Sequence, residues 1–534
     1  MSGGKDKSKL SKPIVIISLT SIILGVAIML ITISVITGFQ EGIRTKVIGF
    51  GSHIQITKDG LNNSMESSPI LIAQDFYPEI ENKPEIKKIQ TFGYKPAILQ
   101  SFRDSVSFQL QENNISRSSL DIIGVLFKGV DENYDWSFFE DKLVSGRLLN
   151  FDSLNNEIMI SSYIAKMMGY KLGDNSDAFF IRDNSEPKRK KFKIVGIYHS
   201  GFEEFDKQLI FTQLQHIQKL NNWGVSNFIT LADTCIDSHF VLKGITSGGS
   251  KSYMYDWGNG YQRNNLYIIK NKPERIRLIS TDFELKPLDN RETPVSIPDT
   301  SYATILINAP CSCNTETLAE VKFESTKKIN TPFGTITIQN GKGTHNLYTG
   351  GFEIIINKWE DLENSNELVY NEIPYNLKTT TITQMHRDIF AWLDLLDMNI
   401  FIIIVLLLIV SLINMITSLL VLILEKTNMI GIMKSMGGKN SSIRKVFIIH
   451  AMFLLSRGLL WGNILGLSLL AFQNFTGFFS LNSEVYSLDT VPVSFNLVHI
   501  LAINGLTIVV CFIILIIPSY LVTKINPVKA IKFD

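Results

Sequence analysis

One dipeptide in this chain has the composition of a nucleotide-binding loop, but its neighbours exclude that chemistry. A phosphate-binding loop needs a glycine, four residues, then Gly-Lys followed by Ser or Thr, because several backbone N–H groups must converge on the phosphates. Gly438 and Lys439 fit the centre of this pattern, but Met433 occupies the first glycine position. Asn440 stands where Ser or Thr is needed. The segment therefore predicts no nucleotide site, and any ATP hydrolysis must come from another chain.

No other set of reactive residues supports catalysis. The eight histidines are scattered, and the sequence contains neither a zinc-binding spacing nor the Gly-x-Ser-x-Gly turn of serine hydrolases. His450 and His499 lie near the ends of apolar runs, where interfacial or packing roles are the simpler interpretation. We therefore expect no catalytic residue, no metal site and no cofactor in this chain. A net charge of +1 gives no electrostatic reason to expect nucleic acid as a partner.

The residues around Gly438 and Lys439 are suited to docking against a partner. Apolar residues recur on one face of a short predicted helix, and two glycines would end it: Met429, Ile432 or Met433, Met436, Gly437 and Gly438. Methionine side chains adapt to a changing groove, which favours a protein partner. The alternative is an amphipathic helix lying on lipid headgroups.

Four apolar runs are long enough to cross a bilayer, which takes about 20 residues. They are residues 13–36, 399–424, 446–472 and 497–520. The first run is longer than the core of a signal peptide, and no small-x-small cleavage site follows it. We interpret it as a retained membrane anchor.

Basic residues predict the orientation of these spans. Lysines occur in residues 1–12, and Lys and Arg recur in residues 425–445 and 521–534, whereas the loop at 473–496 contains neither. The positive-inside rule therefore predicts that both termini and the 425–445 loop are cytoplasmic. Residues 37–398 and the 473–496 loop would then lie outside.

The outer region is long enough for two or three folded units. Residues 37–221 begin with a helical stalk that Gly49 and Gly51 end, and they continue as a mixed α+β domain. The predicted strands are 53–57, 94–102, 120–130, 178–181, 192–198 and 208–211, and the predicted helices are 161–168 and 212–220.

The second part of the outer region differs from the first in amino-acid composition. Residues 222–348 are rich in Gly, Ser and aromatic residues, which predicts an inserted β-rich lobe. Residues 349–398 return to the domain, with strands at 352–358 and 377–384 and a helix at 359–368. A second helical stalk then leads into the span at 399–424.

Polar and small residues inside the spans predict helix packing. Ser411, Asn414 and Ser418 share a face of the second span, and Gly458, Gly462 and Gly466 form a ridge on the third. Arg457 is different, because a charge within a span costs about 2.5–3.5 kcal/mol and must face protein, water or a headgroup. A functional role for Arg457 and simple snorkelling both stay open.

Three cysteines lie on the predicted outer side, where disulfides are permitted. Cys235 can pair with Cys311 or with Cys313, and the spacing does not choose between them. A metal-bound or lipid-modified thiol is the less favoured alternative. Cys511 lies in a span.

Five stretches resemble the lipoprotein-releasing (Lol-type) permeases of ABC transporters. These stretches are residues 25–56, 146–174, 192–211, 424–447 and 517–534. That family is similar to macrolide-exporter-type and FtsX-type permeases, in which four transmembrane helices carry a large periplasmic domain after the first. The resemblance implies an α-helical membrane protein with an α+β periplasmic domain between its first two helices, to which the β-rich lobe is added.

The resemblance also implies a role for the amphipathic segment. In the family the matching residues form a coupling helix that sits in a groove of a separate ATPase. The coupling residues carried over to this chain are Glu425, Lys426, Met429, Ile430, Ile432, Met433, Lys434, Met436, Gly437 and Gly438.

As a Lol-type permease, the chain would couple ATP hydrolysis by that ATPase to extraction of lipoproteins from the inner membrane toward the outer membrane. Acyl chains would enter near Val35, Phe39, Met398 and Phe401. The implied partners are an ABC ATPase dimer that binds ATP and Mg, a second copy or a homologous permease, and the lipoprotein. The implied location is the bacterial inner membrane, with the large domain in the periplasm.

Some alternatives stay open at the level of sequence. The basic run at 187–191 falls where family members of one type carry a loop that recruits a periplasmic lipoprotein carrier, and a solvated hairpin tip is the other interpretation. The chain could also be a macrolide-exporter-type or FtsX-type permease that acts on another cargo or on a cell-wall hydrolase. A third possibility is a membrane-anchored receptor whose lobe binds a ligand.

Overall fold

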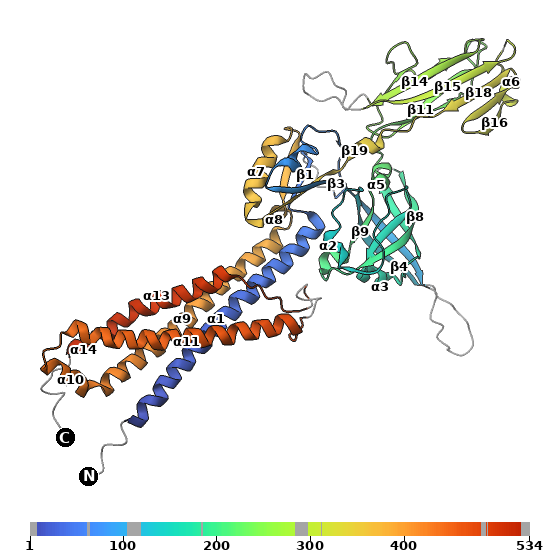
Figure 1. Cartoon of the computed structure of the whole chain (residues 1–534). Coiled ribbons are helices and arrows are strands. Elements are labelled where there is room, and N and C mark those ends of the chain that lie inside the picture. The colour runs from blue at the N-terminus through green and yellow to red at the C-terminus, as the bar shows by residue number, and fades with distance from the viewer. Residues whose placement is uncertain are drawn as a thin grey trace, which may run out of the picture. The chain divides into compact units, whose positions relative to one another are not determined.

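A computed structural model describes residues 8–60, 65–103, 119–182, 185–282, 297–310, 312–481, 488 and 490–524. The chain divides into two compact units (Figure 1). The helical unit comprises residues 1–47 and 386–534, and the sheet unit comprises residues 48–385.

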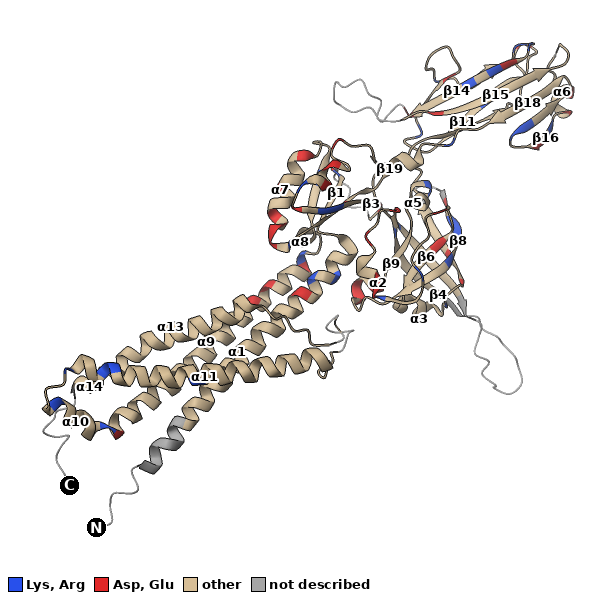
Figure 2. Ribbon diagram, in the orientation of Figure 1, with Lys and Arg blue, Asp and Glu red and all other residues tan. Residues whose placement is uncertain are grey.

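Long helices build the helical unit. They are α1 (Ser8–Gly51), α9 (Arg387–Glu425), α11 (Asn440–Thr476) and α13 (Leu497–Ser519), with the short helices α10 (Thr427–Ser435) and α14 (Leu521–Lys524). Among the described residues, four helices are long and apolar enough to cross a membrane, which confirms the four apolar runs predicted from the sequence. Charged residues are sparse along the middles of these helices, and Lys and Arg gather near α10 and α14 (Figure 2).

Both predicted stalks are continuous with the neighbouring spans. Helix α1 runs without a break to Gly51, where Ser52 takes a positive φ of 58° and ends it. Helix α9 starts at Arg387, so the second stalk and the second span are one helix. Gly477, with φ 58°, ends α11 in the left-handed conformation that glycine adopts without strain.

Ten strands form the main sheet of the sheet unit. They are β1 (Ile54–Lys58), β3 (Ile86–Arg103), β4 (Ser119–Val130), β5 (Leu143–Gly146), β6 (Glu157–Ser161), β7 (Asn175–Arg182), β8 (Ser185–Tyr198), β9 (Leu209–Gln213), β20 (Gly351–Ile356) and β21 (Leu377–Thr381). Strand β3 pairs with β4 and β7, and the path β4-β9-β6-β8-β7 returns to β3. The six strands therefore close a ring, which removes their free edges.

Apolar side chains fill this ring. Leu99, Phe127, Ile160, Phe180 and Phe192 are all buried there, as the alternation of inward and outward residues along strands requires. Two short helices cover the cluster, α3 (Ser162–Met168) and α5 (Leu214–Leu220). Helix α3 begins with Ser161 as its N-cap and ends at Gly169, as predicted.

The strands nearest to the two stalks are neighbours. Strand β1 pairs with β21 in antiparallel register, with Ile54 opposite Thr381, although they are over 300 residues apart in the chain. The His53 carbonyl also accepts a hydrogen bond of 2.8 Å from the Ile382 N–H. The chain thus enters and leaves the main sheet at adjacent strand ends.

Several element boundaries differ from the predictions. Strand β3 begins at Ile86, eight residues early, because its segment from Ile86 to Phe92 pairs with β20. The basic run at 187–191 lies within strand β8 rather than in a hairpin loop, and its backbone pairs with β7. The predicted strand at 377–384 ends at Thr381, after which the short helix α8 (Ile382–Met385) begins, and the predicted helix at 359–368 extends as α7 (Leu362–Glu372).

Residues 226–339 form two further sheets. The first has the order β10 (Ser226–Leu231), β11 (Val241–Ser247), β13 (Leu266–Ile268). The second has the order β12 (Tyr253–Asp256), β14 (Glu274–Asp282), β15 (Asp299–Ile307), β18 (Gly334–Gln339), β17 (Lys328–Thr331), β16 (Lys322–Ser325). Trp223 and Tyr348, inside the range predicted for the lobe, pack instead into the core of the main ring.

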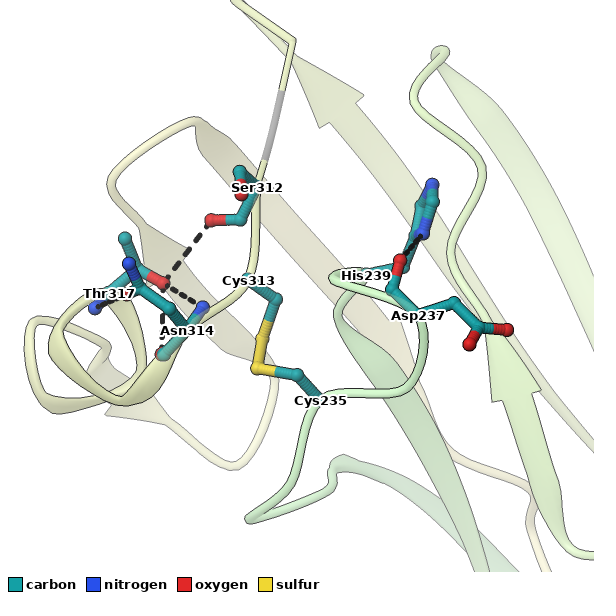
Figure 3. Close-up of a disulfide and its surroundings, with 7 residues drawn as sticks. All are labelled: Cys235, Asp237, His239, Ser312, Cys313, Asn314 and Thr317. Carbon is teal, nitrogen blue, oxygen red and sulfur yellow. Dashed lines mark hydrogen bonds between the residues drawn. A yellow bond between two sulfur atoms is a disulfide. The ribbon is translucent and has the colours of Figure 1, made fainter.

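A disulfide joins two loops of this region (Figure 3). Cys235 bonds to Cys313, with 5.7 Å between their Cα atoms and 78 positions between them in sequence. Asn314, the next residue, caps the short helix α6 (Thr315–Ala319) by accepting from the Thr317 N–H. Cross-linking so long a loop restricts the unfolded chain and stabilises the folded one. Cys311 lies outside the described residues.

Candidate coupling and packing sites

Helix α10 follows α9 after one residue and ends at two glycines. The Lys426 N–H donates to the Leu422 carbonyl, which completes the last turn of α9. At the other end, Gly437 has a φ of 88° and its N–H donates to the Lys434 carbonyl. The Gly438 N–H donates to the Met433 carbonyl at 2.9 Å. These bonds satisfy carbonyl groups at the C-terminus of a helix.

The predicted coupling residues divide between two faces of α10. Ile430 is fully buried and belongs to the core of the helical unit, together with Ile423 and Ile443. The methionine side of α10 is open, and Met436 is 83% exposed. The exposed apolar set consists of Met429, Ile432, Met433 and Met436. The structure therefore brings four of the predicted residues onto one accessible surface and places Ile430 inside the bundle.

The polar coupling residues hold the segment in place. Lys434 Nζ donates to the carbonyl oxygens of Val522 and Thr523, at 2.7 and 3.1 Å. Glu425 and Lys426 form an exposed ion pair of 3.1 Å with each other. Lys434 thereby joins α10 to α14, and a cation suits the negative end of a helix.

The predicted glycine ridge of α11 lies against α1. A Cβ atom added to Gly462 would come within 2.9 Å of the Ile23 carbonyl oxygen and of Val26. Gly458 and Gly466 face Ile22 and Ala27 at similarly short range. The three glycines therefore let α11 approach the backbone of α1.

The predicted polar face of α9 also meets α1. Asn414 Nδ2 donates to Ser21 Oγ, and Ser18 Oγ donates to the Asn414 carbonyl at 3.2 Å. Ser411 stands opposite Gly25, where an added Cβ would lie 2.7 Å from Ser411 Oγ. Ser418 is buried as well. These residues act as packing contacts between helices.

The residues predicted for the cargo opening lie on α1 and α9, where each stalk joins its span. The Phe39 ring packs edge-on against Trp392, with 5.6 Å between the ring centroids. Gln40 Nε2 donates to Asp397 Oδ1 at 2.8 Å, which links the two stalks. Met398 and Phe401 are 63% and 68% exposed, and Val35 is half-buried. The two stalks thus touch at Phe39 while Met398 and Phe401 stay accessible.

A contact that sequence reasoning missed lies on the other side of α1. The Ser494 N–H donates to the Ser34 carbonyl at 3.0 Å, and Leu488 packs at Gly42. A Cβ at Gly38 would come within 2.9 Å of the Ser494 nitrogen. Part of the 473–496 loop therefore lies directly on α1. The spacing of Gly38 and Gly42 was the signal that could have indicated this close approach.

A buried ion pair in the sheet unit was also missed. Lys128 and Glu353 are both fully buried, and Lys128 Nζ lies 2.7 and 2.9 Å from the two carboxylate oxygens. Lys128 Nζ also donates to the Phe50 carbonyl at 2.6 Å, in the last turn of α1. Gln55 and Gln90 donate to the Glu353 carboxylate. Burial lowers the pKa of Lys128, and the attraction of Glu353 opposes that shift.

Aromatic rings surround the same end of α1. Phe50 is buried, stacks on Phe205 with centroids 4.6 Å apart and meets the edges of Phe138 and Phe139. A Cβ at Gly49 would collide with Phe138. The last turn of the first stalk is therefore anchored in the sheet unit by aromatic packing and by Lys128.

Two family models match this chain. Residues 15–235 match the MacB-like periplasmic core domain, and residues 401–527 match the FtsX-like permease C-terminal region. The first match contains the first stalk and most of the helix that it continues, and the second match begins after the second stalk, within the span part of α9.

Curated relatives share modest identity with the chain. The lipoprotein-releasing system transmembrane protein LolC of Neisseria meningitidis is 26% identical over 160 residues, which is 28% of this chain and 39% of the relative. LolC of Haemophilus influenzae is 26% identical over 167 residues, 30% of this chain and 41% of the relative. LolC of Buchnera aphidicola is 25% identical over 241 residues, 43% and 52% respectively. The chain thus matches about half or less of the length of these relatives.

A solved structure of the extracellular domain of the ABC-type transporter YknZ from Gram-positive bacteria shares 11% identity, covering 31% of this chain and 75% of that one. Its TM-score of 0.20 is too low to support an argument about the fold. The family models and curated relatives agree with each other and with the four long apolar helices. The chain is therefore similar to permeases that join a MacB-like periplasmic core domain to an FtsX-like C-terminal region, and its curated relatives are Lol-type permeases.

Proposed function

We propose that this chain is the permease subunit of an ABC transporter that extracts lipoproteins from the inner membrane. A separate ATPase dimer would bind ATP and Mg, and this chain would convert the ATPase cycle into motion of the stalks. The observation that carries the proposal is the exposed methionine surface of α10, formed by Met429, Ile432, Met433 and Met436. A soluble segment that leaves four large apolar side chains uncovered is suited to a protein groove.

The path of motion follows from the way α10 is fixed. Ile430 is buried in the bundle and Lys434 is bonded to α14, so a push on α10 would move the adjoining helices with it. Helix α9 starts six residues after strand β21 and ends one residue before α10. A displacement of α10 would thus be transmitted along α9 to the end of strand β21, because no long flexible segment separates these elements.

The cargo opening is proposed at exposed residues of α9, where the second stalk continues into the second span. Met398 and Phe401 present apolar surface next to the contact between Phe39 and Trp392. Acyl chains need such a surface when they leave the bilayer. A second copy of this chain or a homologous permease would complete the opening.

The coupling surface can be tested by charge substitution. The double variant Met433→Asp and Met436→Asp should abolish co-purification of the ATPase, because each carboxylate would have to be desolvated in the groove. Tyr375→Asp, which alters an exposed ring of the sheet unit, is the matched control and should retain the ATPase.

Lipoprotein release, measured after depletion of the chain, tests the coupling role of α10 and the identity of the cargo separately. Depletion of the chain should leave lipoproteins in the inner membrane, and the double variant should not restore their release. Normal ATPase association and normal release in the double variant would contradict the coupling role. A different outcome would be that depletion of the chain leaves lipoprotein release unchanged while the wild-type chain still co-purifies with the ATPase. That result would refute the lipoprotein cargo and would not affect the coupling role of α10.

A further inference from the structure

One face of α11 carries a charged side chain among exposed apolar ones. Arg457 lies within the apolar run at 446–472, and Phe453 and Trp461 lie one turn to either side of it. All three side chains are exposed. At 3.6 residues per turn, Arg457 lies about 100° around the helix from Gly458, so this face is distinct from the glycine ridge that packs on α1.

The charge on Arg457 has no counter-charge within the described part of the chain. Among those residues, no carboxylate forms an ion pair with it. Its guanidinium lies over the Phe453 ring, 4.5 Å from the centroid. Phe453 precedes Arg457 by one turn, so the side chain is directed toward the N-terminal end of α11, as helix geometry favours.

That direction brings the guanidinium closer to a membrane surface. Arg457 follows Lys445 by 12 positions, which is about 18 Å along a helix. Because the Arg457 side chain bends back over Phe453, its guanidinium is about one turn, or about 5 Å, closer to the start of the span than its backbone is. His450 is exposed on the same face, two turns before Arg457. The two polar side chains therefore lie on either side of Phe453 in one row along the helix.

We propose that Arg457 and His450 hold the phosphate group of a phospholipid against this face of α11. A guanidinium forms paired hydrogen bonds with phosphate oxygens, and an imidazole N–H can donate a further one. The acyl chains would lie along the exposed apolar residues that follow, Trp461 and Ile464. With the orientation predicted from the basic loops, the lipid belongs to the cytoplasmic leaflet.

A lipid fits this face better than a partner helix does. A helix would have to carry a carboxylate to the same depth, and that charge is itself costly inside a membrane. A phospholipid already places its phosphate at the interface, and the phosphate would reach Arg457 by moving inward along α11. The proposal concerns a bound lipid and does not depend on the ATPase or on the transported cargo.

Native mass spectrometry of the full chain in detergent tests the site. The probes are dioleoyl-phosphatidylglycerol and dioleoylglycerol, which has the same acyl chains without the phosphate. The wild-type chain should retain the phosphatidylglycerol and not the dioleoylglycerol. Arg457→Gln should raise the phosphatidylglycerol concentration for half occupancy about fivefold or more, Arg457→Lys should raise it less, and His450→Leu should raise it about twofold. Lys445→Gln removes a positive charge at the start of the helix and should have no comparable effect.

Three results would overturn the proposal. The first is unchanged phosphatidylglycerol binding by Arg457→Gln, and the second is equal retention of dioleoylglycerol. The third is unchanged lipid binding together with loss of a co-purifying membrane subunit, which would assign Arg457 to a protein carboxylate. If Arg457→Gln does not give a single folded species, Arg457→Lys and His450→Leu carry the same test.

Discussion

Lys128 and Glu353 meet across 225 positions of sequence, and each is surrounded by partners that a charge requires. Gln55 and Gln90 donate to the carboxylate, while the Phe50 carbonyl accepts from the ammonium group. A buried pair of this kind adds little net stability over an apolar pair, but loss of one member leaves an uncompensated charge. It lies within the sheet unit and ties the last turn of α1 to strands β4 and β20.

Loss of one member of this pair should cost more than loss of both. Lys128→Met should destabilise the protein by about 3–5 kcal/mol, because Glu353 would stay buried without its counter-charge. The double variant Lys128→Met and Glu353→Gln should recover a substantial part of that loss. Urea unfolding of the four proteins in a double-mutant cycle measures the coupling. Additive effects of the two substitutions would show that the charges do not interact.

Two buried histidines should make the sheet unit sensitive to acid. Burial lowers the pKa of His53 and of His216 from 6.5 to about 4. Both are neutral in the folded protein, and the unfolded chain binds their protons first as the pH falls. Stability should therefore be full above about pH 6.5 and fall between about pH 6.5 and pH 4, by at most about 3 kcal/mol for each histidine.

Unfolding midpoints in urea at pH 7, 5.5 and 4.5 measure this dependence. His216→Gln should flatten it, because glutamine does not titrate. His216 lies in a hydrogen-bonded row, with Nδ1 2.6 Å from Lys190 Nζ and Nε2 2.7 Å from the Asn155 carbonyl. His239→Gln, at an exposed turn, is the control and should leave the pH dependence as it is. Equal slopes for wild type and His216→Gln would rule out His216 as a source of the effect.

At the scale of elements, the contact of α11 with α1 depends on the absence of side chains. Gly462→Ala should destabilise the helical unit by about 1–3 kcal/mol, because the added carbon would meet the α1 backbone at Ile23. Gly505→Ala in α13 is the matched control, since a Cβ there meets nothing within 4 Å. Thermal unfolding in detergent, followed by size-exclusion chromatography, compares the two. A larger loss for Gly505→Ala would contradict this packing.

The helices were more predictable than the sheets, because a helix is specified by residues close together in sequence, whereas strand pairing depends on residues far apart. Each span carries its own apolar run, and Gly51 and Gly437 mark helix ends locally. The closure of the ring through β3 and β7 involves residues such as Ile98 and Phe179, whose pairing depends on distant sequence. Cys235 was expected to pair with one of two cysteines, and only the fold brings Cys313 to it.

For the candidate sites, the sequence indicated the apolar residues of α10 but not which of them turn inward. Ile430 is buried because α10 packs on the bundle, and that depends on the positions of α9 and α11. Gly38 and Gly42 could have indicated a close approach to α1, but the 473–496 loop has no apolar periodicity that would identify Ser494 as the contacting residue. The sequence identified the residues that resemble family motifs, but it did not predict which other residues they contact in the fold.

At the scale of the whole molecule, the pairing of β1 with β21 determines how the sheet unit can respond to force. The first stalk leads into the start of β1, and the second leaves from the end of β21, so any force transmitted by the two helices would act at the Ile54 and Thr381 end of one antiparallel ladder. Forces in the same direction on both stalks would be shared by the two strands. Forces that pull the stalks apart would open the ladder like a zipper, one pair at a time from Ile54 and Thr381, with β21 at the sheet edge leaving first. Under the proposed function, this pairing would limit how far residues Ile54 and Thr381 can separate while the sheet stays intact.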